Sequence, residues 1–133
     1  MATPLLRGAA AYRTTLVESR SPIELVAMIY DGLVGSLTQA RAALAEGDLK
    51  GKRTATTRAL GMIGELQNTL DTEKGGEIAR RLDALYTYIS SRLIEANMNA
   101  EVEGFDEALK LVTPLRDAWV QIAGGPSSVK VPV

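Results

Sequence analysis

The residue types that most often carry out catalysis at neutral pH are missing from this sequence. It contains no His and no Cys, which removes the commonest general base, the usual neutral-pH switch and any thiolate nucleophile. A di-iron carboxylate bundle is excluded, because each of its Glu-x-x-His pairs needs a histidine. Without Cys the chain forms no disulfide, which fits a reducing compartment.

Carboxylates, hydroxyls and glycines remain as candidates for chemistry. Glu65 and Glu95 could act as acid and base, but each lies beside an apolar stripe, so a solvated surface position is the simpler interpretation. The hydroxyls of Ser90-Ser91 have no base to activate them. Gly75-Gly76 could hold an anion at a helix start, but a plain turn is simpler because no Walker pattern accompanies it. We therefore expect no enzyme, no cofactor and no metal site.

Apolar residues recur at steps of three and four in four segments, which predicts four amphipathic helices. The first begins at the capping box Ser21-Pro22-Ile23-Glu24 and ends before Gly47. The others are expected over about 49–70, 77–97 and 101–123, with a turn at 71–76. Long helices joined by short turns predict an all-α fold, an antiparallel up-down-up-down four-helix bundle.

The sequence also predicts how the chain is divided and where it works. Residues 21–123 form the bundle, 1–20 a mobile, flexible N-terminal segment broken by Pro4 and Gly8, and 124–133 a disordered C-terminal tail. We find no signal peptide and no apolar run long enough to span a bilayer. The net charge of −1 argues against nucleic-acid binding. We therefore expect a cytoplasmic protein with no nucleic-acid partner and no membrane insertion.

Two helices carry more apolar residues than a core stripe needs. A helix that is apolar over a wider arc must bury the excess against something, which predicts a docking surface. Met can fill a gap in the core or line an adaptable groove, and both interpretations stay open. A basic cluster on the second helix could meet an acidic partner, although a solvated helix face is simpler. The surplus apolar residues are Leu25, Met28, Tyr30 and Val34 in the first helix and Tyr86, Tyr88 and Ile94 in the third; the basic cluster is Lys50, Lys52, Arg53 and Arg58.

Four groups of motifs stand out along the chain: AY, VE and SPIELVAMIYDG between residues 11 and 32, LDTEKGGEIA at 70–79, ALYTYISSRLIEAN at 84–97, and LRDAW at 115–119. In this order and spacing they resemble the FliS family of flagellin-specific export chaperones. The resemblance spans about residues 10–120. Pro114 departs from the family pattern and predicts a kink or break in the fourth helix, and Gly61 and Gly64 are unusual in a long helix.

The resemblance implies a cytosolic bundle that binds the disordered C-terminal region of flagellin. Binding would prevent premature polymerisation and aid delivery to export gate components of the flagellar apparatus. The alternative is a structural or regulatory helical bundle that self-associates or docks to a folded partner.

The residues that we expect to bind the client fall into four groups. Tyr12 and Val17 belong to a movable segment, and Leu25, Met28 and Tyr30 form groove walls. Tyr86, Leu93 and Trp119 belong either to the groove or to the core, while Asp31, Arg92 and Asn97 either bind client backbone or bond between helices.

Overall fold

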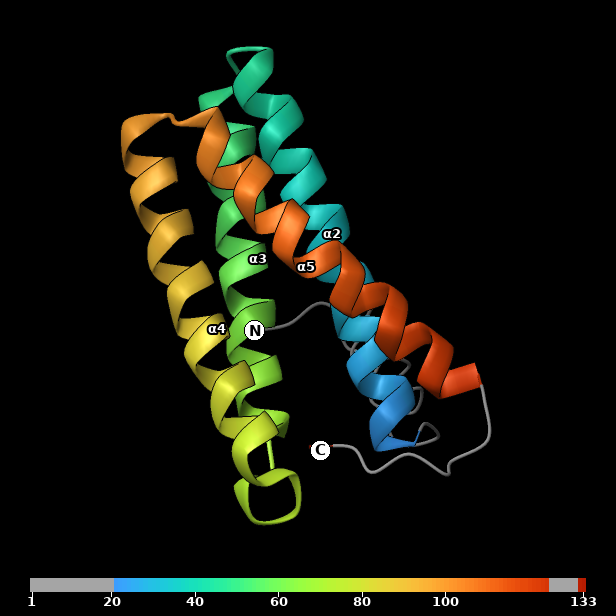
Figure 1. The fold of residues 1–133 in the computed structure, drawn as a ribbon. Coiled ribbons are helices and arrows are strands. Elements are labelled where there is room, and N and C mark those ends of the chain that lie inside the picture. Colours follow the sequence, from blue (N-terminus) through green and yellow to red (C-terminus); the bar gives the residue numbers. More distant parts are fainter. Residues whose placement is uncertain (1–20, 125–131) are drawn as a thin grey trace, which may run out of the picture.

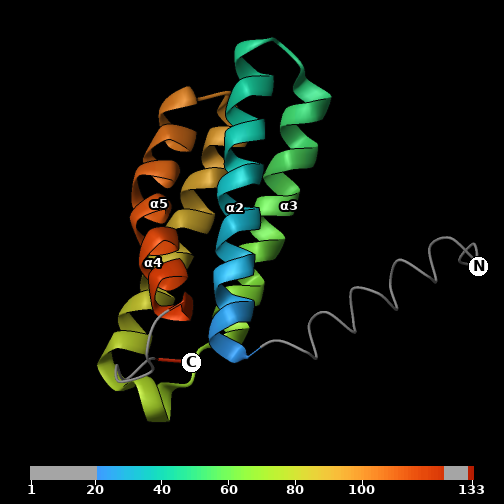
Figure 2. The same ribbon diagram turned by 90° about the vertical axis from the view of Figure 1, so that its right-hand side faces the viewer.

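The computed structural model describes residues 21–124 and 132–133, and the described part is all-α. Its helices are α2 (Pro22–Ala45), α3 (Leu49–Thr69), α4 (Thr72–Asn99) and α5 (Val102–Gly124), and consecutive helices run antiparallel in one bundle (Figures 1 and 2). The predicted fold class is confirmed for these residues. The expected N-terminal segment and most of the expected C-terminal tail lie outside the described residues.

The predicted capping residues begin the first two helices. The Oγ of Ser21 accepts a hydrogen bond from the backbone N–H of Glu24 at 3.2 Å, and Pro22 is the first helical residue. Gly47 has a φ of +77°, in the left-handed region that glycine tolerates, and it ends the turn after α2. The Oδ1 of Asp48 then accepts from the N–H of Gly51 at 2.9 Å and caps α3.

The third predicted helix starts earlier than expected. The sequence predicted a turn at 71–76 and a helix from 77, whereas α4 begins at Thr72 because Asp71 accepts from the N–H groups of Glu73 and Lys74. Gly76 has non-helical angles (φ 53°, ψ −127°) and separates this first turn from the rest of the helix. The break was therefore predicted in the right place, but the helical turn before it was missed.

The core lies between the four helices, each of which contributes buried apolar residues to it. It contains most of the predicted apolar stripes, and fully burying a large apolar side chain of this kind contributes about 1.5–3 kcal/mol. The largest fully buried side chains are Tyr30, Phe105, Leu33, Leu37, Ile63, Leu66, Ile89 and Leu93. None of the helices in the described residues is long and apolar enough to cross a membrane.

The proline in α5 does not divide the helix. α5 runs from Val102 to Gly124 with Pro114 inside it, so the expected break is absent. Pro114 lies on the exposed side, where the lost backbone hydrogen bond can be replaced by water. Gly61 and Gly64 are likewise accommodated within α3, and a Cβ added at either would meet nothing within 4 Å.

Candidate functional site: an apolar groove between α4 and α5

Helices α4 and α5 touch closely at the end where they are joined. Gly104 is buried in the first turn of α5, and a Cβ built on it would lie 2.4 Å from the Cβ of Ala96. The same added Cβ would lie 3.2 Å from Nη1 of Arg92. The two helices can approach this closely only because residue 104 has no side chain.

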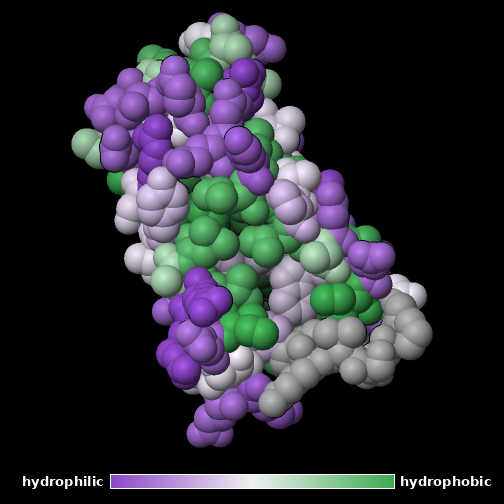
Figure 3. All heavy atoms as spheres, viewed as in Figure 1, coloured by the Kyte–Doolittle hydropathy of each residue, from purple (hydrophilic) through white to green (hydrophobic). Residues whose placement is uncertain are grey.

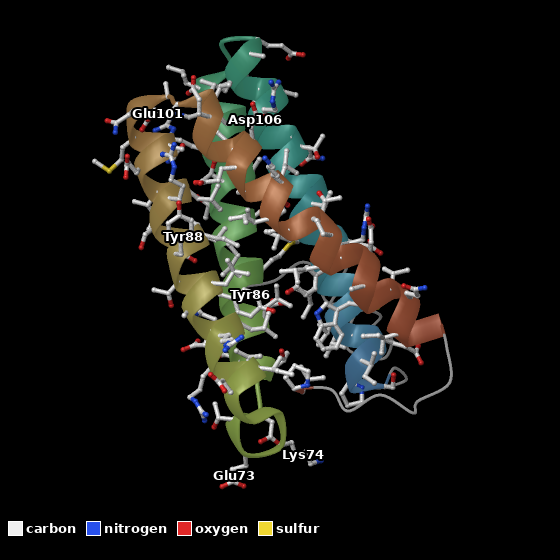
Figure 4. The ribbon with its side chains drawn as sticks, viewed as in Figure 1. Glu73, Lys74, Tyr86, Tyr88, Glu101 and Asp106 are labelled. Carbon is white, nitrogen blue, oxygen red and sulfur yellow. The ribbon has the colours of Figure 1, made fainter. Side chains whose placement is uncertain are left out.

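A charged network holds this joined end together. Nε of Arg92 donates to Oε1 of Glu107 at 3.1 Å, and Nη1 of Arg92 lies 3.7 Å from Oε1 of Glu101 and 3.6 Å from Oε1 of Glu95. The hydroxyl of Tyr88 also donates to Glu107, at 3.0 Å, and this bond raises the pKa of the Tyr88 hydroxyl. Two residues of α4 therefore converge on one carboxylate of α5, and Figure 4 shows Tyr88 and Glu101 in this half of the pair.

Away from that end α4 and α5 diverge, and α3 is visible between them (Figure 1). Figure 3 shows apolar residues gathered along the middle of this face with hydrophilic residues on both sides. α5 packs more extensively along α2 than along α4. α4 and α5 together form a V whose narrow end is the loop that joins them (Figure 1). The wide end of the V lies at the start of α4 and the end of α5.

From the helix spacing we infer that four leucines line the space between the arms of this V, which we call the α4/α5 groove. Leu82 and Leu85 on α4 and Leu111 and Leu115 on α5 are partly buried and pack against the core cluster. Residues three or four apart share a helix face. Leu85 therefore lies on the face of Tyr88, and Leu111 lies on that of Glu107, the two side chains that bond across the V. The groove can accept apolar side chains of a partner without rearranging the core.

A buried aromatic cluster supports the wide half of the bundle. The hydroxyls of Tyr30 and Tyr86 are hydrogen-bonded at 2.5 Å, and the rings of Tyr30 and Trp119 are stacked with centroids 6.4 Å apart. Burial raises the pKa of Tyr30 far above its ordinary value, and the neighbouring Tyr86 adds to the rise. Burial also raises the pKa of Tyr86. Both phenols are therefore neutral at physiological pH and act as structural hydrogen-bonding groups.

The apolar residues predicted to bind the client lie in different environments. Tyr30, Tyr86, Leu93 and Trp119 are buried in the core, so they cannot touch a partner in this conformation. Leu25 is partly buried against the core. Met28 is 39% exposed and is the most exposed of those members of the group that the structure describes. Tyr12 and Val17 lie outside the described residues.

The polar residues predicted to bind the client all bond between helices. Asp31 on α2 accepts from Nη1 of Arg116 on α5 at 3.4 Å, and Arg92 belongs to the network with Glu107. The backbone carbonyl of Asn97 accepts from the buried Nζ of Lys52 at 2.7 Å, which ties α3 to the end of α4. The sequence left interhelical bonding open for these three positions. The structure shows side-chain bonds of this kind for Asp31 and Arg92. At Asn97 only the backbone carbonyl forms one, and the side-chain Oδ1 is buried without a hydrogen-bond partner.

Sequence reasoning missed several residues that shape the groove. Gly104 gave no signal, because a glycine in the first turn of a helix is unremarkable until the neighbouring helix is placed. Leu111 fell between the residues assigned to the fourth apolar stripe, and Tyr88 was noted only as surplus apolar surface. Pro132, which the sequence placed in a disordered tail, is buried, and Val133 packs against the core cluster. The apolar end of an otherwise polar tail was the signal available for these two residues.

The described residues contain no group of three or more His, Cys, Asp or Glu side chains placed to hold a metal ion. An open pocket with a volume of 530 Å³ lies at the α2–α3 turn and is lined by residues that include Gln39, Lys50 and Arg58. Neither its shape nor its side chains point to a reaction, so the α4/α5 groove is the surface that the geometry favours.

Comparison with known proteins identifies the family. The family model described as "Flagellar protein FliS" matches residues 6–126. The chain is 38% identical to the flagellar secretion chaperone FliS of Salmonella typhimurium, over 87% of this chain and 90% of that protein. It is 32% identical to the Escherichia coli protein of the same name, over 96% of this chain and 97% of that protein. It is 34% identical to the Bacillus subtilis protein of that name, over 84% of this chain and 82% of that protein. With a helical bundle, an apolar groove and this similarity over most of its length, the chain belongs to the FliS family of flagellar secretion chaperones.

Proposed function

We propose that this chain is a cytoplasmic export chaperone that binds the disordered C-terminal region of flagellin along the α4/α5 groove. Binding keeps flagellin from polymerising prematurely and presents it to components of the flagellar export gate. The observation that carries the proposal is the divergence of α4 and α5 in Figure 1, with the apolar residues that Figure 3 shows along the middle of this face. The four leucines assigned to the groove walls are partly buried and pack against the core cluster. Membership of a chaperone family supports it and agrees with the absence of a catalytic role.

The groove suits a disordered client for a physical reason. Its two walls run along the helices and are built from apolar side chains with polar groups at the margins. As a disordered chain becomes ordered in the groove, apolar side chains spaced along it can bind to these walls one after another. Ordering such a client costs conformational entropy, and the burial of its apolar surface in the groove offsets that cost.

The decisive experiment measures binding of a synthetic peptide from the flagellin C-terminal region to groove variants by calorimetry. Leu85→Asp and Leu111→Asp place a charge in each wall, and each should weaken binding by about tenfold or more, because burying an unpaired carboxylate is costly. Ile94→Asp is the matched control, since Ile94 lies on α4 with 49% exposure and bonds to nothing across the V. It should leave the affinity within about twofold of the parent.

Other outcomes decide against the proposal. If the groove variants unfold at the parental temperature and still bind the peptide with parental affinity, the groove is not the binding surface. If the parent protein does not bind the peptide but sediments as a dimer, the alternative of a self-associating structural bundle is favoured instead.

A further inference from the structure

The wide end of the α4/α5 groove already contains a piece of chain. Figure 1 shows the end of the sequence, marked C, between α4 and α5, and Figure 2 shows it beside the turn that joins α3 to α4. The residues there are Pro132, which is buried, and Val133, which packs against the core cluster. They lie far along the sequence from the turn that they contact.

The contact is made by backbone as well as by side chains. The N–H of Asp71 donates to the carbonyl of Pro132 at 3.0 Å. Leu70 and Asp71 both have extended backbone angles (ψ 133° and 100°), because they precede the first turn of α4. The N–H of Asp71 is therefore directed away from the helix, as it is at the edge of a sheet. This arrangement holds an extended peptide through its main chain, without selecting a side chain.

The first turn of α4 is shaped to receive that peptide. A Cβ built on Gly75 would lie 2.6 Å from both Cα and Cβ of Pro132, so the proline ring rests directly on the glycine. The break at Gly76 sets this turn apart from the rest of α4. Beside Pro132 is an open pocket of 320 Å³, lined by Glu73 to Ile78, that could take further residues of an extended chain. We call Asp71, Gly75 and this pocket the tail seat.

We propose that the tail seat is a peptide-binding subsite of the groove, that Pro132 and Val133 occupy it in the free protein, and that an extended segment of the client displaces them. The inference rests on the proposed function for the identity of the client. One backbone hydrogen bond and two small apolar side chains make a weak contact, because ordering a chain end opposes them. A contact of that strength opens readily and can be replaced by a longer peptide.

Occupation of the tail seat by the chain's own Pro132 and Val133 has a measurable consequence for client binding. A ligand that needs an open seat binds with an apparent affinity reduced by the fraction of molecules in which the seat is open. If the tail fills the seat for two thirds of the time, removing the tail should tighten binding about threefold. The gain should appear in the association rate, since the bound state is the same with and without the tail.

Two variants remove the tail from the seat by independent routes. Truncation after Gly124 deletes residues 125–133 and leaves every described helix intact. Gly75→Ala keeps the tail but places a methyl group where the proline ring lies. The same methyl group would lie 2.9 Å from the Cβ of Ala79, so a change seen in this variant counts only where the truncation shows it too. Gly61→Ala is the matched control, because it makes the same change inside a helix with nothing within 4 Å of the added methyl group.

Two measurements on the full-length protein and these variants test the proposal. Hydrogen exchange at the Asp71 amide should quicken several-fold in the truncated protein and in Gly75→Ala, and should be unchanged in Gly61→Ala. Association of the flagellin C-terminal peptide, followed by stopped flow, should quicken in the first two variants alone. A synthetic peptide of residues 125–133, added to the truncated protein, should restore protection of Asp71 and slow the client again.

The outcomes separate this inference from the proposed function. If the Asp71 amide exchanges equally fast with and without the tail, the seat is empty in solution and the inference is wrong. If exchange changes but client association does not, the tail is a structural latch outside the path of the client, which also overturns it. If the client binds none of the proteins, the proposed function fails and so does the competition, while exchange at Asp71 still reports whether the tail fills the seat.

Discussion

The phenolic oxygens of Tyr30 and Tyr86 lie 2.5 Å apart and satisfy each other inside the bundle, linking α2 to α4. Both side chains are almost fully buried, so neither hydroxyl can turn to solvent if its partner is removed. The pair is a polar contact surrounded mostly by apolar side chains, and its value depends on both members being present.

Replacing one tyrosine of the pair should therefore cost more than replacing both. Tyr30→Phe leaves the Tyr86 hydroxyl buried without this partner and should lower the free energy of unfolding by about 1–3 kcal/mol. The double variant Tyr30→Phe with Tyr86→Phe should be more stable than the sum of the single changes predicts. Urea unfolding of the four proteins gives the coupling energy, and strictly additive effects would show that the hydroxyls do not bond.

The same pair predicts an alkaline limit to stability. Burial raises the pKa of both phenols above the ordinary value near 10 that they regain on unfolding. Above about pH 10 the unfolded chain releases these protons and the folded chain keeps them, so stability is full below pH 10 and falls as the pH rises. Unfolding curves between pH 8 and 11 should show this decline, and it should be shallower in the double Phe variant.

Gly104→Ala should destabilise the protein although it changes the chain by one methyl group. The added Cβ would lie 2.4 Å from that of Ala96, so the two helices must separate, at a cost of about 1–3 kcal/mol. Gly35→Ala is the control, because a methyl group at that exposed position of α2 meets nothing within 4 Å and should be neutral or stabilising by up to about 1 kcal/mol. Equal melting temperatures for the two variants would mean that the close approach does not exist in solution.

Arg92→Met should lower the free energy of unfolding more than the loss of an exposed ion pair on the same helix does. It removes the cation that Glu95, Glu101 and Glu107 share, and we expect a loss of about 1.5–3 kcal/mol in the free energy of unfolding. Arg81→Met removes an exposed pair with Glu77 on the same helix and should cost less than about 1 kcal/mol. High salt should reduce the difference in stability loss between Arg92→Met and Arg81→Met only slightly, because the Arg92 side chain is mostly shielded from solvent.

Pro114→Ala should stabilise the free protein. α5 continues through Pro114, so alanine restores a backbone hydrogen bond to the carbonyl of Lys110 and removes a steric conflict worth up to about 3 kcal/mol. The observed gain should be smaller, since the helix has already accommodated the ring. A lower melting temperature in thermal unfolding would instead show that the proline conformation stabilises the fold.

Binding of the flagellin C-terminal peptide should show a large negative heat-capacity change. A disordered client that orders in the groove buries on the order of 1,000–3,000 Å² of surface. Calorimetry at four or more temperatures measures it. An enthalpy that does not vary with temperature would indicate a small polar contact.

The sequence predicted the helices well because their signals are local. Ser21 and Pro22 define the start of α2, and the apolar repeats define the buried face of each helix. The helical turn at 72–75 was missed because Gly75 and Gly76 dominate the local propensity, while the Asp71 cap that stabilises this turn acts through backbone geometry.

The site was harder to predict because it depends on how helices are placed relative to one another. Nothing local to Tyr86 or Trp119 distinguishes an aromatic residue on a groove from one in the core, and the structure puts both in the core. The reverse holds for Leu111, which is on the groove only because α5 leans away from α4. The flagellin contacts of these surfaces stay a prediction.

The close contact of Gly104 with Ala96 also gives the V the geometry of a lever. Gly104 lies at one end of α5, and about 20 residues of helix, or roughly 30 Å, separate it from Gly124 at the other. A change of about 5° in the angle between α4 and α5 would move the two arms apart by roughly 2.6 Å at that distance, and hardly at all beside the glycine. Small differences in side-chain volume at positions 96 and 104 would therefore be amplified along the helices, and substitutions there could adjust the width of the groove mouth without touching any residue that lines it.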